Sequence, residues 1–209
     1  MKRILICDDH SAIRNGVKLI LANEFNEIEF GEAINAIEIF KKLKEEKWDL
    51  IILDMDMPGR NGLEVLKQLK SEKSEVPILM FSMHPEGQIA VRALRSGAAG
   101  YLSKDTADTE LVKAIQLILA GKRYITPAIA ELLADQLENP LNKAPHELLS
   151  DREYQTLLLI ASGRTVSQIA EELSLSITTV STYRTRILEK TAMKTSAELT
   201  SYAIRNNLV

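Results

Sequence analysis

The sequence predicts two folded units: a five-stranded, doubly wound α/β domain with a parallel sheet, followed by an all-α domain of four helices. In the first 120 residues, short apolar runs alternate with stretches of helical apolar periodicity. Near-continuous apolar strands fit a parallel sheet that is covered on both faces, and the helices between them supply the crossovers. After Gly121 the strand signals stop, which predicts the helical second unit.

Five apolar runs are the expected strands of the first unit. They are Ile4–Cys7, Ile28–Phe30, Leu50–Leu53, Ile78–Phe81 and Tyr101–Leu102. Helical spacing is clearest between the first two strands, at Ile13, Val17, Ile20 and Leu21, and after the last strand, at Leu111, Ala114, Ile115 and Ile118. In doubly wound folds, ligands bind beyond the carboxyl ends of the strands, so a functional site is expected there.

Residues 121–146 are expected to link the two domains, which span residues 1–120 and 147–209. Pro127 favours the first position of a helix that runs to about Glu138, and the polar, proline-broken stretch Asn139–Ala144 predicts a linker. The spacing of Ser150 and Glu153 predicts a capping box at the start of the next helix. Gly163 is expected to end that helix.

The composition is that of an ordinary folded protein. Apolar residues make up 45% and charged residues 26%, with a net charge of −3, which argues against a disordered chain. No apolar run approaches the roughly 18 residues of a membrane span, and no signal peptide follows Met1. Cys7 is the only cysteine and is expected to be a small buried side chain. A reducing, cytoplasmic location is therefore predicted.

Polar side chains follow the expected strands at one edge of the sheet. Asp8 and Asp9 follow the first strand, Asp54 ends the third, Ser82 ends the fourth and Lys104 follows the fifth. Neighbouring carboxylates repel one another unless a cation lies between them, and Mg²⁺ prefers such oxygen ligands. A carboxylate held beside that cation can attack a phosphoryl group, whose oxygens a lysine and a hydroxyl can bind. Taken singly, each residue is more often structural than functional, as a cap, a turn residue or a surface side chain.

Taken together, these residues resemble the receiver domain of two-component response regulators. The resemblance covers residues 1–120 and rests on Asp8-Asp9, Asp54 followed by Met57-Pro58 and Gly62, Ser82, and Tyr101 three residues before Lys104. It implies that a sensor histidine kinase phosphorylates Asp54, and that Mg²⁺ is held by Asp8, Asp9, Asp54 and the carbonyl of Asp56. It also implies that Ser82 and Lys104 bind the phosphoryl group and that Tyr101 changes rotamer as the switch.

Two positions depart from the common receiver pattern. Asp105 follows the lysine where many receivers have proline, as in the NarL/FixJ subgroup. Met83 follows Ser82 where many receivers have a small residue. The bulk of Met83 leaves the lifetime of the acyl phosphate and the preferred donor open.

The C-terminal region contains two short expected helices joined by a tight turn. Thr165–Leu173 predicts the first helix, Ser174–Ser176 the turn, and Ile177 to about Ala192 the second, with Val180, Ile187 and Leu188 facing inward. Such a pair fits a helix-turn-helix, whose second helix can enter the major groove of DNA. The segment 177–196 has a local net charge of +3, which favours contact with an anion. A plain helical bundle without a DNA role is the alternative.

Finer features of this region resemble the LuxR-type helix-turn-helix. They are Leu149–Glu153, Gly163, Ile169–Leu173, Ser176, Thr179–Ser181, Lys190 and Ala197–Leu199. With the receiver, they resemble the NarL/FixJ family, which implies a DNA-binding transcriptional regulator rather than an enzyme, acting as a homodimer on inverted half-sites in promoter DNA. Tyr183 and Thr191 stand where that family often has His and Leu. The hydroxyl of Tyr183 can still reach a phosphate, whereas Thr191 has no explanation from the sequence.

The contacts with DNA can be divided by helix face. Ser181, Thr182 and Thr185 lie opposite the inward face and are the candidates for base edges. The flanking residues Thr178, Thr179, Tyr183, Arg184, Arg186, Lys190 and Lys194 are the candidates for phosphate contacts, although Arg184 can also reach guanine. The final helix is expected to pair two copies through Leu199, Tyr202 and Ala203.

Two other functions are weighed against this interpretation. Asp54-Met55-Asp56 resembles the Asp-x-Asp motif of haloacid-dehalogenase phosphatases, but Pro58 stands where that family usually has Thr or Val. A regulator that works without phosphorylation is the second alternative, which Met83 keeps open. His10, His84 and His146 lack metal-ligand spacing and are expected to be ordinary surface or loop residues.

Overall fold

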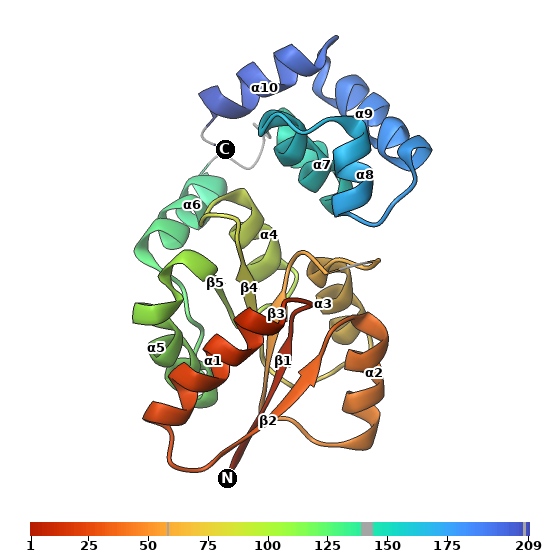
Figure 1. The fold of residues 1–209 in the computed structure, drawn as a ribbon. Coiled ribbons are helices and arrows are strands. Elements are labelled where there is room, and N and C mark those ends of the chain that lie inside the picture. The colour runs from red at the N-terminus through yellow and green to blue at the C-terminus, as the bar shows by residue number, and fades with distance from the viewer. Residues whose placement is uncertain (58, 139–143, 207) are drawn as a thin grey trace. The chain divides into compact units, whose positions relative to one another are not determined.

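The computed structural model describes residues 1–57, 59–138, 144–206 and 208–209. It divides into two compact units, Met1–Leu133 and Ala134–Val209, which are described separately (Figure 1). The predicted linker, apart from Ala144, lies outside the described residues. Among the described residues, no helix is long and apolar enough to cross a lipid bilayer.

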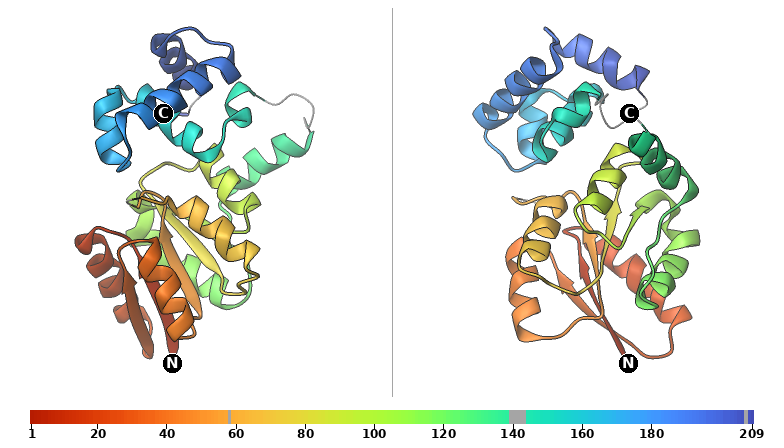
Figure 2. Two further views of the ribbon diagram at one scale, coloured as in Figure 1. Left: turned by 90° about the vertical axis from the view of Figure 1, so that its right-hand side faces the viewer. Right: turned by 180° about the vertical axis from the view of Figure 1, so that it is seen from behind.

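The N-terminal unit contains a five-stranded parallel sheet in the order β2-β1-β3-β4-β5. The strands are β1 (Lys2–Cys7), β2 (Ile28–Ala33), β3 (Leu50–Asp54), β4 (Ile78–Ser82) and β5 (Gly100–Ser103). The helices are α1 (Ser11–Glu24), α2 (Ala36–Glu45), α3 (Gly62–Ser71), α4 (Gln88–Arg95) and α5 (Ala107–Leu119). All five predicted strands are confirmed, each slightly longer than its apolar run. Helices α1 and α5 cover one face of the sheet, and α2, α3 and α4 lie on the other (Figures 1 and 2).

The strands are apolar throughout because both faces of the sheet are buried. Successive side chains of a strand point to opposite faces. One set packs with α1 and α5 in a single core, and it includes Ile4, Ile6, Leu50, Ile52, Leu79 and Phe81. The alternate set, which includes Leu5, Ile51 and Met80, is equally buried. This double burial explains why the sequence shows continuous apolar runs rather than alternation.

The parallel register brings the carboxyl ends of four strands to one edge. Cys7 pairs with Leu53, and Asp54 in turn lies beside Phe81. Ser82 pairs with Ser103, the residue before Lys104. Each of these four strands therefore ends at, or is followed by, a polar side chain at the same edge of the sheet. This arrangement allows the side chains to form one site.

The remaining helices are α6 (Pro127–Glu138), the 3₁₀ segment η2 (Pro145–Leu148), α7 (Asp151–Ala161), α8 (Val166–Glu172), α9 (Ile177–Thr191) and α10 (Ser196–Arg205). Helix α6 begins and ends at the predicted residues. The capping box is confirmed, since the Ser150 side chain accepts from the Glu153 amide and Glu153 accepts from the Ser150 amide. Gly163 follows α7 with a φ of 83°, a conformation that favours glycine at a helix end.

The core of the C-terminal unit corrects the predicted pairing surface. Leu199 and Ala203 of α10 are fully buried within this unit, together with Ile169, Val180 and Ile187. Pairing of two copies through Leu199 and Ala203 is therefore wrong, because these side chains already cover their own domain. Pairing through Tyr202, which is partly exposed, stays a prediction.

Two further side chains complete this core. His146 is only 4% exposed, so its prediction as a surface or loop residue is wrong. Its Nδ1 lies 2.7 Å from the Tyr202 hydroxyl, and its ring also packs near that of Tyr154. Thr191 is buried as well, and its hydroxyl donates to the Ile187 carbonyl at 2.7 Å. This bond satisfies the hydroxyl inside the core and explains how threonine occupies the position.

Candidate functional site

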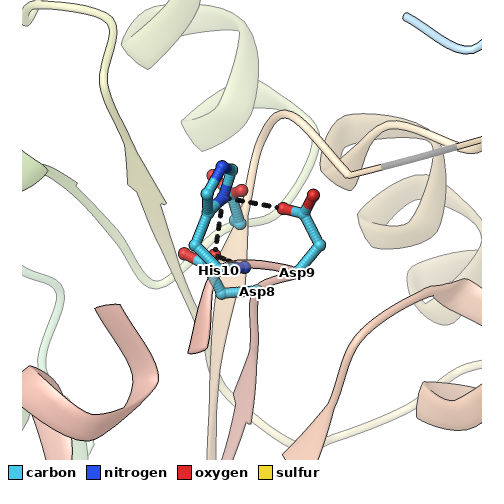
Figure 3. Close-up of side chains that lie close together, drawn as sticks. Asp8, Asp9 and His10 are labelled. Atoms are coloured by element: carbon cyan, nitrogen blue, oxygen red, sulfur yellow. Dashed lines mark hydrogen bonds and ion pairs between the residues drawn. The ribbon is translucent and has the colours of Figure 1, made fainter. Parts of the chain in front are cut away.

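The aspartates predicted at the strand ends come together in the structure. Asp8, Asp9, His10 and Asp54 each offer one atom able to bind a metal, and these atoms all lie within 4.8 Å of one another. Asp8 and Asp54 are buried, whereas Asp9 is partly exposed. Figure 3 shows Asp8, Asp9 and His10 at the end of β1. We call Asp8, Asp9 and Asp54 the acidic cluster.

Lys104 supplies the counter-charge of the acidic cluster. Its Nζ lies 2.7 Å from Asp8 Oδ2 and 2.9 Å from Asp54 Oδ1. The side chain is only 5% exposed, so Lys104 is not a surface lysine. The short 3₁₀ turn η1 (Lys104–Thr106) directly follows β5 and places it there. A cation held at this distance from a carboxylate can also bind an oxygen of any group attached to that carboxylate.

His10 is a neighbour of the cluster that sequence reasoning missed. Its Nδ1 lies 2.9 Å from Asp9 Oδ1 and 3.3 Å from Asp8 Oδ1, although the side chain is 67% exposed (Figure 3). The His10 amide also donates to Asp8 Oδ1 at 2.8 Å. Asp8 therefore both shapes the turn before α1 and contributes to the cluster, because its two oxygens have different partners.

The negative charge of the acidic cluster is only partly neutralised by Lys104. Burial raises the pKa of Asp54 to about 6, and the charges of Asp8 and Asp56 raise it as well, while Lys104 acts against them. Burial acts to lower the pKa of Lys104, but Asp54 and Asp8 raise it above its ordinary value. Lys104 thus stays charged, yet it does not fully compensate two buried carboxylates. A further cation would stabilise the ionised form of Asp54.

Ser82 and Tyr101 meet at the loop between β4 and α4. Both side chains are fully buried. The Ser82 hydroxyl accepts from the His84 amide at 3.1 Å, and the Tyr101 hydroxyl donates to the His84 carbonyl at 2.8 Å. His84 Nε2 in turn lies 3.2 Å from Asp56 Oδ2, which joins this loop to the end of β3. His84 is therefore more than an ordinary loop residue, because it connects the candidate phosphoryl-binding and switch residues.

Met83 lies in the same loop, directly after Ser82. Its side chain is 59% exposed. Its effect on the lifetime of an acyl phosphate stays a prediction.

The candidate DNA contacts lie on α9, except Lys194, which lies between α9 and α10. Thr178, Ser181, Thr182, Thr185 and Arg186 are exposed, as are Lys190 and Lys194, whereas Thr179, Tyr183 and Arg184 are partly exposed. Two of the cations have protein partners. Arg184 Nε donates to the Ser196 hydroxyl at 2.8 Å, and Lys190 Nζ donates to Glu153 Oε2 at 2.6 Å. Their charge is thus partly committed to holding α9 against its own domain.

Replacing Lys190 with alanine is expected to destabilise the C-terminal unit by about 1 to 3 kcal/mol, because Glu153 would lose a charged partner. The Glu153 side chain is only 3% exposed. Burial acts to raise the pKa of Glu153, but hydrogen bonds from Lys190 and Ser150 lower it below its ordinary value. The stabilisation is therefore present at neutral pH and is lost as the pH falls through that lowered pKa.

Thermal unfolding of the full chain measures this effect, with Lys194→Ala as the matched control on an exposed lysine nearby. The control is expected to change stability by less than about 0.5 kcal/mol. Equal unfolding temperatures for the two variants would show that the ion pair contributes nothing.

Comparison with known protein families matches both units. Residues 4–116 match the response regulator receiver domain, and residues 147–203 match the bacterial regulatory proteins of the luxR family. The match over the acidic cluster is thus to receivers, not to the phosphatases that Asp54-Met55-Asp56 resembles.

Relatives extend over the whole chain. The response regulator GacA of Pseudomonas viridiflava is 38% identical over 210 residues, covering 100% of this chain and 98% of its own. UvrY of Escherichia coli K12 is 37% identical over 209 residues, covering 100% and 96%.

Solved structures show the same fold. A LuxR-family two-component response regulator from Aurantimonas sp. SI85-9A1 is 32% identical, covering 65% of this chain and 97% of its own, with a TM-score of 0.58. The response regulator ChrA is 28% identical, covering 99% and 98%, with a TM-score of 0.51. The chain therefore belongs to the NarL/FixJ family of two-component response regulators, which are transcriptional regulators that join a receiver to a LuxR-type DNA-binding domain.

Proposed function

We propose that Asp54 is the phosphoacceptor of a Mg²⁺-dependent receiver, and that its phosphorylation by a sensor histidine kinase controls the binding of promoter DNA by α9. The observation that carries this proposal is the acidic cluster with Lys104 2.9 Å from Asp54 Oδ1. The ligand atom of Asp54 also lies within 4.8 Å of those of Asp8 and Asp9.

The oxygens of the cluster fit a hard divalent cation. Asp8 Oδ2, Asp9 Oδ1 and Asp54 Oδ1 are buried atoms with ion-pair neighbours but no hydrogen bond of normal geometry. Carboxylate oxygens of this kind are the ligands that Mg²⁺ prefers, and the carbonyl of Asp56 would add a further one. When bound, Mg²⁺ would neutralise charge on the carboxylates and on the phosphoryl oxygens.

The protein side chains have distinct parts in the transfer. An Asp54 oxygen attacks the phosphorus atom while the bond from phosphorus to the donor's leaving group breaks. Lys104 would bind a phosphoryl oxygen without moving far from its present position. Ser82 accepts a hydrogen bond from the His84 amide, so its own hydroxyl hydrogen remains for a phosphoryl oxygen. The Tyr101 hydroxyl donates to the carbonyl of His84, and the Tyr101 side chain would change rotamer as the switch when Asp54 is phosphorylated.

Incubation with Mg²⁺ and acetyl phosphate is expected to add one acid-labile phosphoryl group, detected by intact mass spectrometry. Asp54→Asn removes the nucleophile and should show no label, whereas Asp9→Ala removes a ligand and should abolish the dependence on Mg²⁺. Equal labelling of wild type and Asp54→Asn would contradict the assignment. A wild type that takes no label would favour the phosphorylation-independent regulator.

The DNA-binding part of the proposal concerns α9. Its exposed face would enter the major groove, and Thr178, predicted from the sequence as a phosphate contact, belongs to this face. The phosphates would be contacted at the flanks by Arg186 and Lys194, together with Thr179, Tyr183, Arg184 and Lys190. Binding as a homodimer to inverted half-sites is proposed on the basis of the family, with a pairing surface other than Leu199 and Ala203. A cytoplasmic location belongs to the same proposal and is supported by the single, buried cysteine.

A further inference from the structure

Three threonines occupy the centre of the exposed face of α9. At 3.6 residues per turn, Thr178, Thr182 and Thr185 lie within about 60° of one another around the helix axis. All three are exposed, whereas Val180 and Ile187 on the opposite side are fully buried. The part of α9 that would face the floor of the major groove is therefore built largely from small, methyl-bearing side chains.

Two of these hydroxyls are bonded to the backbone of the helix itself. Thr182 Oγ1 donates to the Thr178 carbonyl at 2.9 Å, and Thr185 Oγ1 donates to the Ser181 carbonyl at 3.1 Å. A threonine hydroxyl has only one hydrogen. While these bonds persist, each side chain can offer DNA its methyl group and an oxygen lone pair, but no hydrogen-bond donor.

The nearby cations are displaced from the centre of this face, although Arg184 keeps further donors beyond its Nε. Arg184 Nε is bonded to Ser196, and Lys190 is bonded to Glu153. Arg186 lies at the flank, where it suits a phosphate. Guanine offers two acceptors in the major groove, O6 and N7, and its specific recognition depends on donors such as arginine. Thr182 and Thr185 themselves are therefore poorly suited to guanine.

We propose that α9 reads the C5-methyl group of thymine, together with the amino group of its paired adenine, and that Thr182 and Thr185 determine this specificity. An A·T pair presents both a methyl group and an amino donor in the major groove, whereas a G·C pair presents no methyl group. The methyl groups of the threonines match the thymine methyl, and their acceptor oxygens match the adenine amino group. This inference rests on the proposed role of α9 in DNA binding.

The test removes single methyl groups from the DNA. The full chain, treated with Mg²⁺ and acetyl phosphate, selects a preferred duplex from a random library. Each thymine of that duplex is then replaced by deoxyuridine, which lacks only the C5-methyl group. Replacing a thymine that contacts a threonine is expected to lower the affinity for the duplex about four-fold. This factor corresponds to the free energy lost when the burial of one methyl-sized group is lost.

Matched protein variants remove the methyl group of the threonine instead of the methyl group of the thymine. Thr185→Ser keeps the hydroxyl but loses the methyl group, so it should bind the thymine and deoxyuridine duplexes equally at one position. Thr185→Val keeps a methyl group and should retain the discrimination. Thr182→Ser and Thr182→Val should behave likewise at a second position. Circular dichroism checks that each variant folds.

Arg186→Ala separates failure of this inference from failure of the proposed function. Loss of one phosphate contact should reduce the slope of log affinity against log salt concentration by about 1. The reduction should be the same for the thymine duplex and for the deoxyuridine duplexes. If Arg186→Ala has this effect but no deoxyuridine changes affinity, methyl recognition is overturned and α9 still binds DNA. If neither Arg186→Ala nor any threonine variant changes binding, the assignment of α9 is itself overturned.

Discussion

Replacing Asp54 with asparagine is expected to raise the free energy of unfolding at pH 7 without Mg²⁺ by about 2 to 3 kcal/mol. Burial, with the charges of Asp8 and Asp56, raises the pKa of Asp54 from 3.8 to about 6 in the folded protein. The ionised carboxylate is thus less stable in the folded than in the unfolded chain. A shift of about two pKa units corresponds to about 3 kcal/mol, and this shift already includes the attraction of Lys104 for the carboxylate.

The effect has a defined pH dependence. Because the folded-state pKa is raised, the cost of ionised Asp54 is fully present above about pH 6 and shrinks as the pH falls towards 3.8. The stability difference between Asp54→Asn and wild type should therefore be large at pH 7 and much smaller at about pH 4.5. Added Mg²⁺ should stabilise wild type more than the variant, since Asp54 is a proposed ligand.

Urea unfolding at the two pH values, with and without Mg²⁺, measures these differences. Asp108→Asn, at an exposed position of α5, is the matched control and should change stability by less than about 0.5 kcal/mol. An Asp54→Asn variant that is less stable than wild type at pH 7 would show that Lys104 fully compensates the buried charge.

The substitution Gly62→Ala, which adds a methyl group, is expected to destabilise the N-terminal unit by about 3 kcal/mol. Gly62 begins α3 directly behind the acidic cluster, where its amide donates to the Met55 carbonyl at 2.8 Å. An ideal Cβ at this position would lie 2.0 Å from the Asp54 carbonyl oxygen. The backbone of the phosphoacceptor or the start of α3 must then move, so Gly62→Ala should also weaken Mg²⁺ binding.

Gly16→Ala provides the control for this substitution. Gly16 lies within α1, and a Cβ there would have no neighbour within 4 Å. Alanine favours the helix over glycine by about 1 kcal/mol, so this variant should be more stable than wild type. Urea unfolding compares the two. If both variants gain stability, α3 is not fixed against Asp54 as the structure has it.

The sheet and the acidic cluster could be predicted because two simple rules apply to them. A strand that is buried on both faces of the sheet appears in the sequence as a continuous apolar run. Parallel strands also bring their carboxyl ends to the same edge of the sheet. Asp8, Asp54 and Lys104 are far apart in sequence, yet each directly ends or follows a strand. Their proximity therefore follows from the topology alone, without knowledge of side-chain conformations.

The remaining contacts depend on packing that the sequence does not encode locally. An apolar face on α10 can cover its own domain or a second copy, and apolar periodicity does not distinguish the two, so the sequence does not show that Leu199 is buried in its own domain. Lys190 and Lys194 are both basic residues near the same helix end, but only Lys190 reaches the buried Glu153. His84 contacts Asp56 only because two loops meet above the sheet edge.

The central claim is that phosphorylation of Asp54 controls DNA binding, and the DNA affinity of the full chain before and after acetyl phosphate treatment tests it most directly. Fluorescence anisotropy with the selected duplex, in Mg²⁺ and at fixed salt, gives both affinities. Wild type is expected to bind more tightly after treatment, by at least about five-fold, the lower end of typical allosteric coupling. Asp54→Asn is expected to bind equally before and after. An equal gain in Asp54→Asn, or a labelled wild type whose affinity does not change, would contradict the account.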